Sequence, residues 1–240
     1  MSQRTDEVWK AATLTAAFLK GVRGAIPLAM EQLDVMARLL AASERPIRRF
    51  LDVGCGDGIL AATILERFPE AEAVLIDFSA PMIDAARERF AGSPSQIHAL
   101  IVDYAAPRWI ESVAQWGPYD AIVSGYSIHH QPDERKREIY AEIHGLLAPG
   151  GVFVNVEHVS SASPWIESVH DELFLDHLCR YHAGKRRAEV AETYYHRADK
   201  AANILAPVEL QCQWLREIGF SDVDCYMKLF ELAVFGGRRA

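Results

Sequence analysis

The central part of the chain alternates short apolar runs with longer stretches in which apolar residues recur at helical spacing. The apolar runs predict strands at 50–54, 73–77, 97–102, 119–124 and 151–156, with helices at 58–67, 80–91, 108–115 and 133–147 between them. A helix over 210–218 and two strands near 222–228 and 230–236 complete the pattern. Strands that alternate with helices of this length form a parallel sheet covered on both faces. We therefore predict an α/β fold with a seven-stranded, mostly parallel sheet and helices on both faces.

Two helical segments lie outside this alternation. Residues 8–42 are broken into at least two helices by Gly21, Gly24 and Pro27, and residues 164–205 form a long insertion before the sixth strand. Ligands of open α/β sheets bind beyond the carboxyl ends of the strands, and only these two segments are free to cover that edge. We predict that they form a lid. The expected single domain thus comprises a helical cap (1–45), a core (46–158), a helical lid (159–207) and a C-terminal helix with two strands (208–240).

Composition narrows the class of partner. Half of the residues are apolar, the formal net charge is −8, and the four cysteines show no paired spacing. No apolar run reaches the roughly 18 residues of a membrane span, and the N-terminal residues lack the apolar stretch of a signal peptide. The negative net charge argues against nucleic-acid binding, which needs a basic face. We expect a soluble cytoplasmic protein with a small-molecule substrate, away from membranes; a homodimer is left open.

A glycine-rich turn follows the first strand of the core. The strand carries Asp52, and Gly54, Gly56 and Gly58 alternate before the next helix. Glycines here leave the main-chain amides open to a ligand. The G-x-G-x-G spacing differs from the G-x-G-x-x-G of a dinucleotide site. The next apolar run ends in Asp77, where an acid can hold ribose hydroxyls.

This pattern resembles the class I S-adenosylmethionine-dependent methyltransferases, a Rossmann-like family, over residues 47–157. The resemblance implies S-adenosylmethionine as cofactor, with Gly54 and Gly56 against its amino-acid part. It also implies that Asp77 holds the ribose, Asp103 the adenine amine, and that Phe78 packs on the adenine. The predicted cofactor-binding residues are Asp52, Gly54, Cys55, Gly56, Asp77, Phe78, Met82, Asp103, Tyr104 and Ser124.

Histidines follow the fourth and fifth strands. His129 or His130 can serve as a general base, although histidines there also cap helices or line pockets. Glu157 and His158, together with one of these histidines, could supply metal ligands. Ser124 and Tyr126 depart from the pattern of catechol-type metal sites, and we predict no metal. The predicted substrate-binding residues are Tyr126, His130, His158, Tyr195 and Arg197.

The insertion carries a second, weaker resemblance. Arg197, the stretch 215–220 and the N-terminal Arg23-x-x-Ile26-Pro27 are similar to the carboxy-S-adenosylmethionine synthases, which implies that Arg197 binds a carboxylate. Leu28 stands where that family has a tyrosine soon after the proline, and the glycine loop differs as well. We predict O- or N-methylation of a small polar or anionic molecule. The alternatives are a synthase-like enzyme of tRNA wobble-uridine modification and a non-catalytic cofactor-binding subunit.

Overall fold

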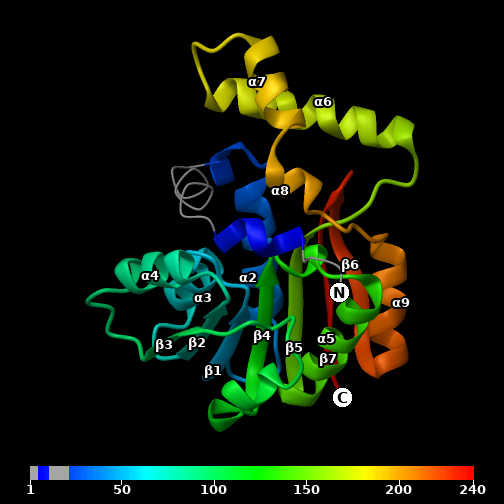
Figure 1. Ribbon diagram of the computed structural model, residues 1–240. Helices are drawn as coiled ribbons and strands as arrows, with labels where there is room; N and C mark the ends of the chain where they lie inside the picture. Colours follow the sequence, from blue (N-terminus) through cyan, green and yellow to red (C-terminus); the bar gives the residue numbers. More distant parts are fainter. Residues whose placement is uncertain (1–4, 11–21) are drawn as a thin grey trace.

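The computed structural model describes residues 5–10 and 22–240, and its centre is one seven-stranded sheet (Figure 1). The strands lie in the order β3-β2-β1-β4-β5-β7-β6. Strands β1 to β5 are parallel, and β7 runs antiparallel to both β5 and β6. The bounds are β1 Arg49–Val53, β2 Glu72–Asp77, β3 Ile97–Ile101, β4 Tyr119–Gly125, β5 Leu147–His158, β6 Phe220–Leu229 and β7 Leu232–Arg239. The predicted Rossmann-like α/β fold is confirmed.

Helices cover both faces of the sheet. One face carries α2 (Ala29–Ala41), α3 (Ile59–Arg67) and α4 (Ala80–Arg89), and the other carries α5 (Asp133–Leu146) and α9 (Val208–Ile218). Successive strand residues point to opposite faces. Phe50 accordingly belongs to the buried cluster under α2 and α3, whereas Leu51 belongs to the cluster under α5 and α9.

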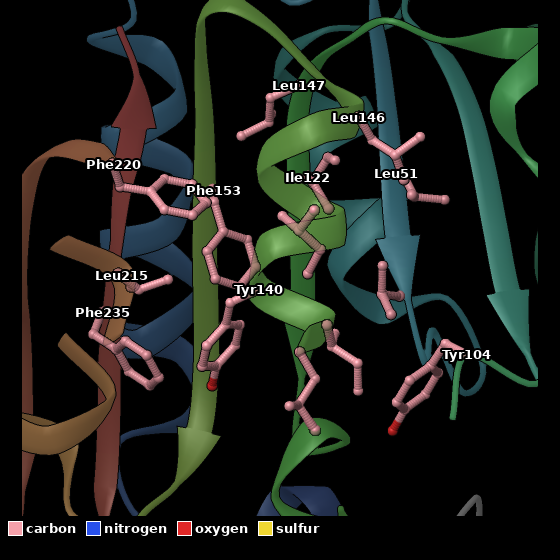
Figure 2. Close-up of a cluster of buried hydrophobic side chains, with 14 of the residues drawn as sticks. Leu51, Tyr104, Ile122, Tyr140, Leu146, Leu147, Phe153, Leu215, Phe220 and Phe235 are labelled. Atoms are coloured by element: carbon pink, nitrogen blue, oxygen red, sulfur yellow. The ribbon is translucent and has the colours of Figure 1, made fainter. Parts of the chain in front are cut away.

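Aromatic rings pack together with aliphatic side chains on the α5–α9 face of the sheet (Figure 2). Tyr140 of α5 lies between Phe153 of β5 and Phe235 of β7, with ring centroids 5.7 and 6.4 Å away. Phe153 also contacts Phe220 of β6 at 6.0 Å. Aromatic pairs at these distances contribute about 0.5–1.5 kcal/mol each beyond the area they bury. This packing fixes the central strands, and with them the strand ends.

Two predicted elements differ from the structure. The helix expected over 108–115 is two short 3-10 turns, η3 (Trp109–Ser112) and η4 (Ala114–Trp116). So short a segment, bounded by proline and glycine, has too few residues for a stable α-helix, and burial of Trp109 sets its conformation. Strand β5 starts at Leu147, before the expected 151–156, and the residues between the expected helix and strand form a bulge where the pairing with β4 shifts register.

The remaining helices lie beyond the carboxyl ends of the parallel strands (Figure 1). They are η1 (Thr5–Lys10), η2 (Val22–Ala25), η5 (Ile128–His130), α6 (Pro164–Tyr181), α7 (Arg187–Tyr195) and α8 (Ala198–Ala201). The expected N-terminal helices are therefore represented by η1, η2 and α2, while residues 11–21 and the side chain of Arg23 lie outside the described residues. Helices α6 and α7 enclose a small core of their own with Ala25, Leu175, Leu178, Val190 and Tyr194.

The cysteines and the lengths of the helices can be compared with the predictions from the sequence. All four cysteines are free. Among the described residues, no helix combines the length and the apolar character that crossing a bilayer requires.

Candidate active site

A cavity of about 430 Å³ opens at the carboxyl ends of the parallel strands. One end is formed by the turns after β1, β2 and β4, and we call it the strand end. The other is walled by α6, the C-terminal part of α7, and α8, and we call it the helical end. Trp9 of η1 also lines the cavity, so the N-terminal segment and the insertion both contribute walls.

The glycine loop forms the floor of the strand end. Gly54 and Gly56 have φ angles of 68° and 54°, a region that favours glycine. A Cβ on Gly54 would lie 1.9 Å from the Ser127 hydroxyl oxygen. A Cβ on Gly56 would meet nothing closer than the Met82 sulfur at 3.9 Å. Packing therefore requires glycine at 54, while Gly56 borders open space, which fits a ligand lying against this loop.

Asp77 at the end of β2 ties this loop to the next turn. Its Oδ2 accepts a hydrogen bond from the Gly56 amide at 3.0 Å, and its Oδ1 accepts one from the Ser79 amide at 2.8 Å. Burial raises the pKa of Asp77 to about 6, despite these hydrogen bonds, which lower it. A carboxylate has about four acceptor sites. The carboxylate oxygens that border the cavity can also accept from ribose hydroxyls, which is the role that the resemblance implies.

The other predicted cofactor residues divide into two groups. Most line the cavity: Asp52, Cys55, Phe78, Met82 and Tyr104. Asp103 and Ser124 are not among the described residues that line it. The Ser124 hydroxyl is fully buried and donates to the Val53 carbonyl at 2.7 Å, so it joins β4 to β1. Asp103 accepts from the amide of Ala105 at 3.0 Å and thereby shapes the turn after β3.

His129 and Glu157 form a buried pair beside the cavity. His129 Nδ1 lies 2.6 Å from Glu157 Oε1, and the His129 amide donates to Oε2 at 3.1 Å. Glu157 is fully buried, while His129 lines the cavity. A carboxylate at Nδ1 fixes the tautomer with the proton on that nitrogen, which leaves the Nε2 lone pair to accept a proton. This is the arrangement of an oriented general base.

His130 is held differently, although it is the neighbouring residue. Its Nε2 accepts from the Trp9 indole at 3.0 Å, and its Nδ1 lies 3.4 Å from the Ala202 carbonyl. Burial, followed by the charge of neighbouring His129, holds the pKa of His130 well below its usual value. Both ring nitrogens thus have partners, and the side chain connects η1 to the segment after α8.

Four of the predicted substrate residues line the cavity: Tyr126 in the turn after β4, and His130, His158 and Arg197. Tyr195 does not belong to the described lining and is 47% exposed. Its neighbour Tyr194, which was not among the predicted residues, lines the cavity. Consecutive residues on a helix point about 100° apart, so only one of the pair can face inward.

Tyr194 belongs to a polar group with two residues that the sequence interpretation missed. The Tyr194 hydroxyl donates to Asp171 Oδ1 at 2.6 Å, and Lys200 Nζ lies 2.8 Å from the same oxygen. Lys200 also stands over the Tyr194 ring, 4.2 Å from its centroid. Asp171 and Lys200 carry no local motif, and only the cluster of polar residues in the insertion hinted at them.

Known proteins that are similar to this chain are methyltransferases. A family model described as a methyltransferase domain matches residues 51–153. The chain is 39% identical over 111 residues to an uncharacterized methyltransferase of Mycobacterium tuberculosis (strain ATCC 25618 / H37Rv), covering 46% of this chain and 50% of that protein. It is 30% identical over 199 residues to the trans-aconitate 2-methyltransferase of Rhodopseudomonas palustris (strain BisA53), covering 72% of this chain and 68% of that protein. The chain thus spans about half the length of several curated relatives it matches.

The fold is also found among solved structures. Human N-acetylserotonin methyltransferase in complex with SAM superposes with a TM-score of 0.64 at 12% identity, covering 100% of this chain and 59% of that chain. At this identity the likeness shows the fold.

Proposed function

The chain belongs to the class I S-adenosylmethionine-dependent methyltransferases, and from this premise we propose that it methylates a hydroxyl oxygen of a small polar or anionic molecule. The observation that carries the proposal is the His129–Glu157 pair on the wall of the cavity. A base is needed only when the acceptor carries a proton that must leave. An oriented base therefore favours a hydroxyl over an acceptor that has no proton to lose.

In this proposal the strand end binds the cofactor, and His129 and Glu157 remove the proton of the acceptor. When bound, S-adenosylmethionine supplies a methyl group on a sulfonium, which the acceptor oxygen takes up as the carbon–sulfur bond breaks. The glycine loop and Asp77 hold the cofactor at the strand end. His129 Nε2 takes the hydroxyl proton, and Glu157 stabilises the imidazolium that results. General-base catalysis of this kind contributes about 10²- to 10⁴-fold.

The helical end supports a substrate with a negatively charged group. Arg197 and Lys200 both line the cavity there. A guanidinium pairs bidentately with a carboxylate, so Arg197 suits this class of substrate. Lys200 already pairs with Asp171 at 2.8 Å and serves mainly to hold the wall. Hydroxy acids and phenolic acids combine the two features, an acceptor hydroxyl and an anionic group.

A turnover screen tests the proposal. S-adenosylhomocysteine formation is measured against a panel of hydroxy acids, phenols and amines, and the methylated atom is located by NMR of the product. In His129→Gln we expect kcat to fall by about 10²- to 10⁴-fold with cofactor affinity unchanged. His196→Gln is the matched control, because that side chain is 72% exposed. Methylation of nitrogen only, or a His129→Gln rate within about threefold of the parent, contradicts the proposal.

Arg197 on the cavity wall also supports a second candidate, a cofactor that itself carries a carboxylate. Under that alternative the guanidinium binds the modified cofactor and not the acceptor. Mass spectrometry of the ligand that co-purifies with the protein separates the two. A mass higher than that of S-adenosylmethionine by one carboxyl group favours the second candidate.

A further inference from the structure

Three side chains from different elements meet at the helical end of the cavity. His158 ends β5, His170 lies in α6, and Glu231 stands in the tight turn between β6 and β7. One donor atom of each lies within 4.8 Å of the other two. Glu231 Oε2 is 2.9 Å from His158 Nε2 and 3.6 Å from His170 Nε2. A metal that binds nitrogen and oxygen at about 2.0–2.2 Å holds neighbouring donors roughly 3–3.5 Å apart. The distances from Glu231 to His158 and to His170, 2.9 and 3.6 Å, lie on either side of that range.

The hydrogen bonding of His170 is incomplete. The residue is 1% exposed. Its Nε2 lies 3.6 Å from Glu231 Oε2, farther than an ordinary hydrogen bond spans. Buried polar atoms are nearly always satisfied, and an ion between Nε2 and Glu231 would supply the contact that is missing there. Nδ1, on the other side of the ring, has no hydrogen-bond partner among the described residues, and its satisfaction needs a separate group.

His158 has the support that a ligating histidine needs. Its Nδ1 lies 3.3 Å from the Asn203 side-chain nitrogen. The orientation of an amide is an assignment, and with the amide turned by 180° its oxygen would accept a hydrogen bond from the Nδ1–H of His158. Metal-binding histidines usually donate their second ring N–H to such a partner. That arrangement directs the Nε2 lone pair toward Glu231 and His170.

We propose that His158, His170 and Glu231 bind a divalent transition-metal ion. Two imidazoles and one carboxylate suit Zn²⁺ or Fe²⁺, and three protein ligands leave at least one coordination position open to the cavity. This differs from the ligand set considered from the sequence, which shared only His158 and included Glu157. Glu157 is engaged by His129 and by the His158 amide, and its side chain serves the base.

The site lies next to the proposed base. The rings of His158 and His129 have centroids 5.7 Å apart. An ion held by the cluster can bind the acceptor oxygen, lower the pKa of its hydroxyl and orient it, while the proton passes to His129. This catalytic role rests on the proposed methyl transfer, whereas metal binding itself does not.

Calorimetry on the full chain, purified without a histidine tag and stripped with a chelator, tests the site. Zn²⁺ is titrated in the absence of cofactor and substrate, and Co²⁺ serves as a spectroscopic probe. We expect one equivalent of Zn²⁺ to bind, and His170→Gln and Glu231→Gln each to weaken binding more than about a hundredfold. The exposed His196 again supplies the control, and His196→Gln should bind as the parent does.

Several outcomes overturn the site. The site is contradicted if the parent protein fails to bind Zn²⁺ at concentrations up to about millimolar, or if Glu231→Gln binds Zn²⁺ as tightly as the parent does. A Co²⁺ spectrum with thiolate charge transfer would assign the ion to a cysteine. If His170→Gln or Glu231→Gln has a lower melting temperature than the parent, His158→Gln is used in its place, because His158 is partly exposed. Failure here leaves the His129→Gln result untouched, so the site and the proposed function fail separately.

Discussion

The two ends of the cavity are built by different kinds of interaction. At the strand end, side chains bond to the backbone: Asp77 accepts from the amides of Gly56 and Ser79, and the Tyr104 hydroxyl donates to the Ser127 carbonyl at 2.9 Å. At the helical end, side chains bond to one another, as in the Tyr194–Asp171–Lys200 group.

The apolar support differs in the same way. The strand end rests on two large clusters that fill both faces of the sheet, whereas α6 and α7 share only a small cluster of their own. The strand end should therefore tolerate little change in its backbone. Side chains of the helical end can change without cost to the sheet, so substitutions there can alter the acceptor site while the strand end keeps its structure.

Substitution of the glycines gives the largest expected effect and tests the rigidity of the strand end. Gly54→Ala combines a positive φ with the clash against Ser127, and we expect the free energy of unfolding to fall by roughly 3–5 kcal/mol. Gly56→Ala has the same backbone strain without the clash and should cost about 1–2 kcal/mol. Urea denaturation measures both. Equal losses in the two variants would show that packing against Ser127 does not restrict the loop.

Arg197→Ala tests whether the helical end recognises the substrate. We expect kcat/KM to fall about ten- to a thousandfold through loss of a charged hydrogen bond, while the affinity for S-adenosylmethionine and the melting temperature stay near those of the parent. Arg186→Ala is the control, because that side chain is 81% exposed. A loss of cofactor affinity equal to the loss of kcat/KM would remove the distinction between the two ends.

Asp77→Asn tests whether the strand end binds the ribose of the cofactor. We expect cofactor binding to weaken by roughly 1.5–3 kcal/mol, the scale of hydrogen bonds to a charged group, and calorimetry measures the change. Unchanged affinity in a folded variant would disprove the ribose assignment.

The pH dependence of binding sharpens this result. Because burial raises the pKa of Asp77 to about 6, protons compete with the cofactor below that pH, and affinity should fall as the solution becomes more acidic. The folded apo protein binds this proton more tightly than the unfolded chain, whose carboxyl has a pKa near 3.8. The contribution of Asp77 to the stability of the apo protein should therefore rise as pH falls from about 6 toward 4. Asp77→Asn should remove both dependences, which run in opposite directions.

The smallest expected effect concerns the Lys200–Asp171 ion pair. Lys200 is partly exposed, so Lys200→Met should lower the free energy of unfolding by less than about 1 kcal/mol. Hydrogen exchange should nevertheless accelerate in α6–α8 and remain unchanged in β1, β4 and β5, because side-chain pairs hold the helical end locally. Cofactor and substrate together should protect α6–α8 more than the cofactor alone does. Equal acceleration in the sheet would show that the two ends open as one unit.

Local spacing in the sequence was enough to predict the strand end. Apolar runs bounded by turn residues predicted each strand of the sheet, and the alternating glycines before α3 predicted the loop that lines the cavity. Such features depend on residues within one turn or one βαβ unit of each other, where backbone preferences act directly. The exception, Ser124, has the right position on its strand, but its hydroxyl points into the sheet and bonds to Val53.

Which side chains face the cavity at its helical end was determined by the tertiary structure. The sequence offered His129 and His130 as equivalent bases, and only burial beside Glu157 and Trp9 distinguishes them. It offered Tyr195, while the rotation of α7 turns its neighbour inward.

The proposed metal ligands show the same limit most clearly, since Glu231 stands 73 positions after His158 in a turn that no pattern marks. Composition and periodicity determined which elements form and how they are ordered. Which side chains meet in the cavity depended on helix rotation, on the antiparallel return of β7 and on contacts between distant segments, because these alone set the direction of each side chain.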